Sequence, residues 1–356
     1  MSKSMLSGCR IAGVSSCVPS KVFNNLEDAV DFPLTEVRKV VAMAGVSERR
    51  VSDGTICSSD LCAQAASDLM SRLGWDPASI DGLIMITQSP DYFLPSTSCL
   101  IHRKLGLSVD CATFDVGLGC SGYTYGLWLA SMMLQSGHQR VLVLHGETPS
   151  YFTSPEDRAT FLLFGDAGSA TALEKTSATT QDDMPPWYFT MYTDGSGYGD
   201  LIMRGGGFRE RHPDDPQRNF LQMSGTNVFN FTIKRVPSLI QDTLDFARCT
   251  VEDVDYFVFH QSNRFIMKHL MKKCGLPEEK VPITLERFGN TGGPSVPLTI
   301  TQGVFGGSRA LSGGAPLTLL LLGYGVGLSW GAGLVTLDAD VVIAHSEMDH
   351  GGLFDE

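Results

Sequence analysis

Three side chains that could cooperate in acyl transfer stand beside glycines or at the end of an apolar run. They are Cys120 in "GLGCSGY", His260 in "FVFHQSNRF" and Asn290 in "RFGNTGGPSVP". A thiolate is a good nucleophile for a thioester, imidazole can exchange a proton, and an amide can donate hydrogen bonds. Apolar positions follow Cys120 at helical spacing as far as Gln135, so we expect it at a helix start, where the helix dipole lowers a thiol pKa.

Each of the three also has a structural interpretation. Free cysteines are often buried as small hydrophobes, a lone histidine at a strand end is commonly structural, and asparagine is common in turns. The combination favours thioester chemistry over these separate explanations. The stretch "GYGVG" (323–327) follows a buried run and is either a tight hairpin or a source of backbone N–H groups for an oxyanion beside Cys120. It lacks the Gly-Lys-Ser/Thr of a phosphate loop.

Strand-like and helix-like segments alternate along the chain, which predicts an α/β protein with parallel strands. The expected strands are 10–18, 81–89, 111–117, 140–147, 167–173, 187–193, 254–261, 316–325 and 329–337. Open α/β sheets bind ligands at the carboxyl ends of their strands. The chemistry should therefore converge where 111–117, 254–260, 281–288 and 317–323 end.

The chain also resembles itself at a constant offset. "WDPASIDGLIMITQS" (75–89) parallels "CTVEDVDYFVFHQS" (249–262), and "GLGCSGYTYGLWLASMML" (117–134) occupies the slot of "GNTGGPSVPLTITQGVF" (289–305). The order of such matches predicts a duplicated unit, with an N-terminal half at 1–175 that carries the cysteine and a C-terminal half at 176–356 that carries the histidine and asparagine. We expect surface loops at 176–220 and a loose acidic tail at 339–356.

Composition excludes several classes of function. The 356 residues carry a net charge of −12 and have no basic run, which disfavours nucleic acid as a partner. No apolar stretch is long enough to cross a membrane. The nine cysteines are scattered without a C-x-x-C pair, so neither a disulfide framework nor a metal site is expected, and reduced thiols fit a cytoplasmic protein.

Five motifs in order resemble the β-ketoacyl-ACP synthase III family of the thiolase superfamily over roughly residues 8–337. They are "LGCSGYTYGL", "PEDRATFLLFGDAGSA", "HQSNRFI", "GNTGGPSVP" and "GYGVGLSWG". The resemblance implies a duplicated thiolase-like fold, layered α-β-α-β-α, with two mixed sheets related by pseudo-twofold symmetry. It also implies a cytoplasmic homodimer, a place in fatty acid biosynthesis and no cofactor, because the substrates are carried on CoA or on the phosphopantetheine of acyl carrier protein.

The same resemblance implies a role for each site residue. Cys120 is the nucleophile that takes an acyl group from a thioester, and His260 and Asn290 stabilise the enolate formed when malonyl-ACP loses CO2. The backbone N–H groups of Cys120 and Val326 form the oxyanion hole. The tunnel residues implied are Phe164, Leu94 and Gly325, with Leu94 in a loop that reaches the partner subunit.

Departures from the family pattern concern the acyl donor. Lys39 and Met43 stand where acetyl-CoA-dependent members have Trp and Arg, and Phe265 stands where an Arg is usual. We therefore expect a donor other than acetyl-CoA, either an acyl-ACP or a longer acyl group. Arg264, Lys268 and Lys272 recur at i, i+4 and i+8 and suit docking of the acidic carrier protein, although they could equally be an ordinary solvated helix face.

Two other functions stay open at this level. One is a non-condensing acyltransferase that delivers the acyl group to an alcohol or an amine, which differs from a condensing enzyme only through the role of Asn290. The other is a catalytically quiet subunit of a heteromeric synthase, against which the complete set of Cys120, His260 and Asn290 argues.

Overall fold

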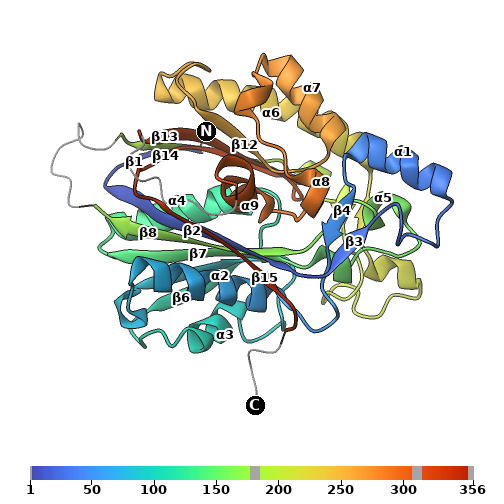
Figure 1. The fold of residues 1–356 in the computed structure, drawn as a ribbon, viewed down its shortest axis with the longest axis horizontal. Helices are drawn as coiled ribbons and strands as arrows, with labels where there is room; N and C mark the ends of the chain where they lie inside the picture. Colours follow the sequence, from blue (N-terminus) through green and yellow to red (C-terminus); the bar gives the residue numbers. More distant parts are fainter. Residues whose placement is uncertain (1, 177–184, 307–314, 352–356) are drawn as a thin grey trace.

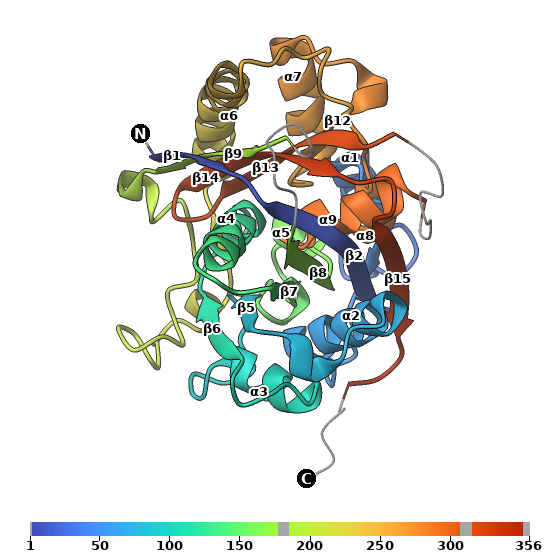
Figure 2. The same ribbon diagram turned by 90° about the vertical axis from the view of Figure 1, so that its left-hand side faces the viewer.

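The two sheets of this protein lie face to face with helices between them and on both outer sides (Figures 1 and 2). The computed structural model describes residues 2–176, 185–306 and 315–351. From one outer side to the other, the layers are α6 and α7, a five-stranded sheet, α4 and α9, a six-stranded sheet, and α2 and α3. The layering α-β-α-β-α expected from the sequence is therefore confirmed.

The six-stranded sheet has the order β15-β2-β8-β7-β5-β6 and mixes parallel with antiparallel pairs. Its strands are β2 (Cys9–Pro19), β5 (Gly82–Ile86), β6 (Ala112–Val116), β7 (Arg140–Glu147), β8 (Ala167–Lys175) and β15 (Val342–Met348). β5 pairs in parallel with β6 and β7, and every residue of β5 is buried, as expected for a strand covered on both faces.

The five-stranded sheet has the order β1-β9-β14-β13-β12. Its strands are β1 (Ser2–Leu6), β9 (Trp187–Thr193), β12 (Tyr256–Phe259), β13 (Leu317–Gly325) and β14 (Ser329–Leu337). Only β12 and β13 pair in parallel, so this sheet too is mixed, which confirms the mixed sheets that the family resemblance implied and corrects the separate expectation of parallel sheets. Two short antiparallel ribbons complete the strands, β3 (Val22–Asn24) with β4 (Glu48–Arg50), and β10 (Leu201–Ile202) with β11 (Gln222–Met223).

The central helices pack against both sheets. α4 (Gly122–Gln135) contacts β7 and β5 on one side and β14 and β13 on the other, and α9 (Ser295–Thr299) likewise bridges β8 and β12. The outer and peripheral helices are α1 (Leu34–Ala44), α2 (Ser58–Leu73), α3 (Thr97–Lys104), α5 (Arg158–Phe161), α6 (Gly225–Ala247), α7 (Arg264–Cys274) and α8 (Leu285–Phe288). None of the helices in the described part of the chain is long and apolar enough to cross a membrane.

Local sequence signals explain where α7 begins and ends. The side chain of Asn263 accepts a hydrogen bond from the N–H of Ile266 at 2.8 Å, which caps the first turn. Gly275 ends the helix in the left-handed conformation at φ 65°, a conformation that glycine adopts without strain. α7 therefore starts immediately after the loop that follows His260, at the carboxyl end of β12.

Several sequence expectations need correction. Residues 281–288 form no strand, because α8 occupies Leu285–Phe288. Within the segment 176–220 the expected strand 187–193 is confirmed as β9, whereas β10 is a short strand that the expectation of loops did not include, and residues 177–184 lie outside the described part. The tail is not loose over its whole length, because residues 342–348 form β15 in parallel with β2, while residues 352–356 lie outside the described part.

The two sheets exchange their terminal strands across the chain midpoint. β1 from the first half pairs with β9 of the second-half sheet, and β15 from the second half pairs with β2 of the first-half sheet. The first-half and second-half segments are therefore interlocked, although the site residues still come from separate sheets.

Candidate active site

Cys120 lies in the turn between β6 and α4, two residues before the helix starts. The turn is tightly packed, because a Cβ added at Gly119 would lie 2.3 Å from the Gln88 side chain, and one at Gly122 would lie 2.6 Å from Ile86. The glycines let the chain pass these neighbours while it presents the thiol. The predicted helix after Cys120, ending at Gln135, is confirmed.

The thiol of Cys120 is not activated in the way that the helix start suggested. Desolvation raises the pKa of Cys120 to about 11, and the charge of Glu147 adds to that increase. Hydrogen bonds from the backbone N–H groups of Val326 and Cys120 act in the opposite direction but do not overcome burial. The expectation of a lowered pKa is therefore wrong, and Cys120 rests as a neutral thiol.

His260 follows β12 and is buried, with Nδ1 near two different partners. Nδ1 lies 3.0 Å from the carbonyl oxygen of Gly292 and 2.9 Å from Oγ of Ser295. Burial lowers the pKa of His260 to about 4, so the imidazole is neutral at physiological pH. Nε2 lies on the opposite edge of the ring from these partners.

Asn290 follows α8 and is held by the same backbone that faces His260. Its Oδ1 accepts a hydrogen bond from the N–H of Gly292 at 2.9 Å, and its Nδ2 donates to the carbonyl oxygen of Ser262 at 3.3 Å. Since Nδ2 carries two hydrogens, one remains to donate elsewhere. Gly292 adopts φ 69°, and through its N–H and C=O it orients both Asn290 and His260.

One pocket brings these side chains together. We call it the inner pocket; its lining includes Cys120, Phe164, Leu201, His260, Asn290 and Gly325, and its volume is about 90 Å³. It shares Leu163, Met223, Gly225, Asn263 and Ile266 with a larger surface groove of about 530 Å³. This entrance groove, lined also by Val40, Met43, Arg158, Phe229 and Phe265, connects Cys120 with the surface.

The loop after β13 lies directly against the nucleophile. A Cβ added at Gly325 would stand 2.8 Å from Cβ and 2.9 Å from Sγ of Cys120. The next residue, Val326, directs its backbone N–H to the sulfur. The two loops are tied together by the hydroxyls of Ser121 and Ser329, which lie 2.6 Å apart. This arrangement fits the expected oxyanion hole at Cys120 and Val326.

Comparison with known proteins agrees with this geometry. Residues 114–195 match the family model of 3-oxoacyl-(acyl-carrier-protein) synthase III, and residues 244–337 match the model of its C-terminal region. The β-ketoacyl-(acyl-carrier-protein) synthase III of Syntrophomonas wolfei is 33% identical over 339 residues, which cover 93% of this chain and 98% of that protein. The chain belongs to the 3-oxoacyl-(acyl-carrier-protein) synthase III family.

Solved structures give the same result for the fold. A 3-oxoacyl-(acyl-carrier-protein) synthase of Burkholderia xenovorans LB400 superposes with a TM-score of 0.91 at 39% identity, covering 97% of this chain and 99% of that one. The priming β-ketosynthase of the R1128 polyketide pathway gives a TM-score of 0.81 at 26% identity, with coverage of 94% and 98%. The protein is thus a condensing acyltransferase of the synthase III type with a thiolase-like fold.

In this synthase III family member, the buried guanidinium of Arg49 holds the backbone of Phe164 in place. The guanidinium of Arg49 donates to the carbonyl oxygen of Phe164 at 2.9 Å and to Oδ1 of Asn25 at 2.9 Å. It also lies over the rings of Phe23 and Phe161, at 4.4 and 5.0 Å from their centroids. Phe164 itself lines the inner pocket, as the tunnel expectation requires.

The structure agrees only in part with the expected tunnel residues and the expected docking residues. Gly325 lines the inner pocket, whereas Leu94 is 79% exposed and does not line it within one chain. On α7, Lys268 and Lys272 are exposed, but Arg264 is partly engaged with the Gly45 carbonyl oxygen at 3.3 Å and with Glu286 at 3.6 Å. The lysines of the predicted docking stripe are therefore the more available part of it.

Sequence reasoning missed several residues that shape the site. Ser295 contacts His260, and the hydroxyl of Tyr324 donates to the His260 carbonyl oxygen at 3.2 Å. His145 is fully buried behind the site, where its ring would meet any Cβ added at Gly293. Ser295 belongs to the motif "GNTGGPSVP", but it lies 35 residues from His260 along the sequence, so the sequence alone did not predict their contact.

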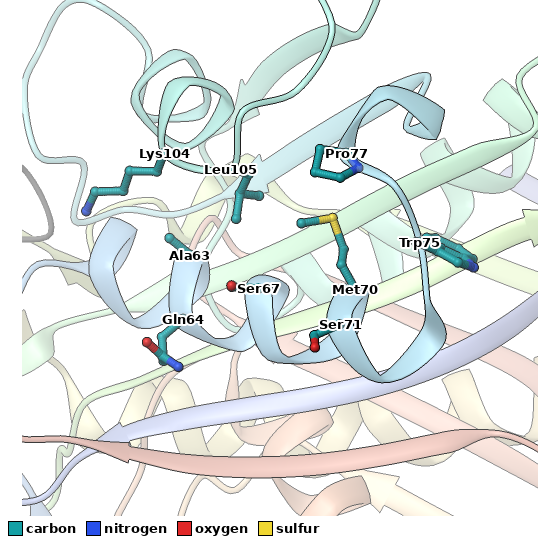
Figure 3. A pocket seen from close by; sticks show the side chains of 9 residues that line it. All are labelled: Ala63, Gln64, Ser67, Met70, Ser71, Trp75, Pro77, Lys104 and Leu105. Atoms are coloured by element: carbon teal, nitrogen blue, oxygen red, sulfur yellow. The ribbon is translucent and has the colours of Figure 1, made fainter.

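A second hollow lies between α2 and α3 on the far outer layer, away from the thiol (Figure 3). It is lined by small and apolar side chains such as Ala63, Ser67 and Met70, with Lys104 at one end, where Lys104 Nζ lies 2.5 Å from Oδ1 of Asp60. Within the described residues no group of His, Cys, Asp and Glu is arranged to hold a metal ion.

Proposed function

We propose that this enzyme makes a β-ketoacyl thioester by decarboxylative condensation, with Cys120 as nucleophile and with His260 and Asn290 acting on the malonyl group. The observation that carries the proposal is the convergence of the three side chains in the inner pocket, with the N–H of Val326 directed to the sulfur. Placement of charge-stabilising donors at such a site commonly accounts for much of the rate enhancement of acyl transfer.

The first half-reaction transfers an acyl group to Cys120. Because the thiol and His260 both rest neutral, the Cys120 proton passes to Nε2 as the new S–C bond forms. The bond to the donor thiol breaks, and the departing sulfur takes that proton from Nε2. The N–H groups of Cys120 and Val326 hold the oxyanion of the tetrahedral intermediate.

The second half-reaction uses the same pocket for the malonyl thioester. Its C–C bond to the carboxylate breaks, CO2 leaves, and the electron pair forms an enolate that accepts hydrogen bonds from Asn290 Nδ2 and from Nε2–H of His260. The enolate carbon attacks the acyl-cysteine, the C–S bond to Cys120 breaks, and the released thiolate takes a proton from solvent. Asn290 is suited to this role because Gly292 and Ser262 already fix its amide.

The proposed donor is an acyl group on a carrier protein and not acetyl-CoA. In the entrance groove, Met43 is 60% exposed, and Arg158 is already paired with Glu36. Phe265 stacks on Phe229 with ring centroids 5.6 Å apart, so this side of the groove is apolar.

The proposed partner is an acidic acyl carrier protein that docks on α7. Lys268 and Lys272 are exposed on this helix, and Phe265 and Ile266 of the same helix line the entrance groove. Replacing both lysines by glutamate should raise KM for malonyl-ACP while leaving the acylation of Cys120 by a small thioester unchanged. Arg103→Glu on α3, which belongs to the opposite outer layer, is the matched control. Equal effects of the two substitutions would contradict docking on α7.

A second copy of the chain is proposed to cover the free edge of the six-stranded sheet. β6 is the last strand of that sheet, and Phe114 on it is 37% exposed. The nearby loop 89–100 exposes 71% of Phe93 and 79% of Leu94. Open apolar edges favour pairing with another chain. Light scattering should give the molar mass of a dimer, and Phe114→Lys should shift that mass toward the value of a monomer.

All nine cysteines are free, consistent with the proposed cytoplasmic location.

The experiment that tests the proposed reaction weighs both proteins. The enzyme is mixed with a panel of acyl-CoAs and acyl-ACPs, malonyl-ACP is added, and intact mass spectrometry follows the enzyme and the carrier. An acyl mass on Cys120 followed by a β-ketoacyl mass on the carrier supports the proposal and identifies the donor. Acylation without consumption of malonyl-ACP would instead indicate transfer to an alcohol or amine, and no acylation by any donor would indicate a quiet subunit.

A further inference from the structure

The proposed reaction makes two opposite demands on Nε2 of His260. It must be unprotonated to accept the Cys120 proton, and it must carry a proton to donate to the enolate. In neutral imidazole only one ring nitrogen carries a proton, so the protonation of Nδ1 decides which role Nε2 can play. The partners of Nδ1 therefore control both half-reactions.

The two partners of Nδ1 differ in which tautomers they can support. The Gly292 carbonyl oxygen, at 3.0 Å, can only accept, so it stabilises a proton on Nδ1 and leaves Nε2 with its lone pair. The hydroxyl of Ser295, at 2.9 Å, can donate to an unprotonated Nδ1, which places the ring proton on Nε2. A serine hydroxyl rotates to serve either tautomer, whereas a backbone carbonyl cannot.

The surroundings of Ser295 leave its proton available for this purpose. Ser295 is 1% exposed, at the first residue of α9, and its Oγ accepts a hydrogen bond from the Gln261 N–H at 3.1 Å. The Gln261 N–H occupies one of the two lone pairs of Oγ, and the hydroxyl hydrogen stays free to point to His260. The backbone N–H groups of His260 and Ser295 are themselves hydrogen-bonded, to the carbonyl oxygens of Leu322 and Gly292, so the two side chains are held in place before substrate binds.

We infer that Ser295 is a positioning residue that lets His260 adopt the tautomer with the proton on Nε2, and thereby permits the decarboxylation step. The inference rests on the proposed function. The acylation step uses the tautomer that Gly292 supports, and the decarboxylation step uses the tautomer that Ser295 supports. The exchange is balanced, because Nδ1 releases one proton to solvent while Nε2 takes one from solvent that enters through the entrance groove.

Ser295→Ala tests this inference because it removes the hydroxyl and leaves Gly292 as the partner of Nδ1. Two rates are measured separately: acylation of Cys120 by intact mass, and release of CO2 from malonyl-ACP by the acylated enzyme. We expect acylation to stay within about threefold of the wild-type rate and CO2 release to fall about 10²-fold, the usual effect of losing one donor to a developing oxyanion. Ser295→Thr, which keeps a hydroxyl, should recover most of that loss.

Ser131→Ala is the matched control, since Ser131 is equally buried in α4, donates to the Leu127 carbonyl oxygen at 2.7 Å and lies beside Cys9, outside the lining of the inner pocket. It should change neither rate. Equal losses in acylation and CO2 release for Ser295→Ala, or no loss in CO2 release, would overturn the inference while the wild-type enzyme still condenses. Failure of the wild-type enzyme to condense would instead refute the proposed function.

A measurement on the unmodified chain covers the case in which the Ser295 variants do not fold. ¹⁵N shifts of the His260 ring in the wild-type acyl-enzyme, labelled at its eight histidines, distinguish the two tautomers. We expect a substantial fraction with the proton on Nε2. A ring held wholly with the proton on Nδ1 would overturn the inference.

Discussion

Substitution of Gly325 by alanine is the sharpest test of how the nucleophile is positioned. The new Cβ would stand 2.8 Å from Cβ and 2.9 Å from Sγ of Cys120. Carbon and sulfur need about 3.5–4.0 Å, so the thiol or the loop must shift by about 1 Å. A displacement of about 1 Å at a reacting group costs about 10² in rate, equal to about 2.7 kcal/mol of transition-state stabilisation.

The assay is the rate at which Cys120 gains an acyl mass at saturating donor. Overpacking also lowers the free energy of unfolding by about 1–3 kcal/mol, so thermal unfolding is recorded alongside. Gly195→Ala is the control, because nothing lies within 4 Å of the Cβ it would add. An acylation rate for Gly325→Ala within threefold of wild type, in folded protein, would refute the positioning argument.

Three further predictions concern the same pocket. Asn290→Asp keeps the acceptor for the Gly292 N–H but loses the amide donor, so CO2 release should fall about 10²–10³-fold while acylation by intact mass changes little; retained condensation would contradict the mechanism. The acylation rate should stay level with pH between the pKa values of His260, about 4, and Cys120, about 11, and fall below pH 4 because protonated His260 cannot accept the thiol proton. The check is a stopped-flow measurement of the acylation rate against pH. An inflection near neutral pH would mean that Cys120 loses its proton before the donor binds. Leu201→Ala, which enlarges the inner pocket, should shift the preferred donor in a chain-length panel by about two carbons, and an unchanged preference would place the acyl chain elsewhere.

The turn that carries Cys120 and the positions of the main strands along the chain could be predicted from the sequence, because both depend on local sequence patterns. Glycines around Cys120 and Asn290 mark tight turns, and the apolar runs of β5 and β13 are typical of strands buried on both faces. The helical periodicity after Cys120 likewise predicted α4 to within two residues.

What escaped prediction depends on the surroundings that distant segments create. The pKa of Cys120 is set by desolvation from several elements, which outweighs the local effect of the helix start. The contact between Ser295 and His260 joins residues that only the packing of α9 against β12 brings together. β15 was missed because His345, Ser346 and Glu347 make its sequence look polar, although it pairs with β2 over its whole length.

The exchange of terminal strands has a consequence for how the chain acquires its structure during synthesis. β2 is the first strand of the six-stranded sheet to be made, yet its neighbour β15 is made only after residue 341, so one edge of that sheet stays unpaired until residues 342–348 have been synthesised. Such distant pairings slow folding and expose strand edges to aggregation. A nascent chain stalled before β15 should therefore bind chaperones and resist ordering, and a full-length chain with a weakened β15 should accumulate in inclusion bodies even when Cys120 and its partners are intact.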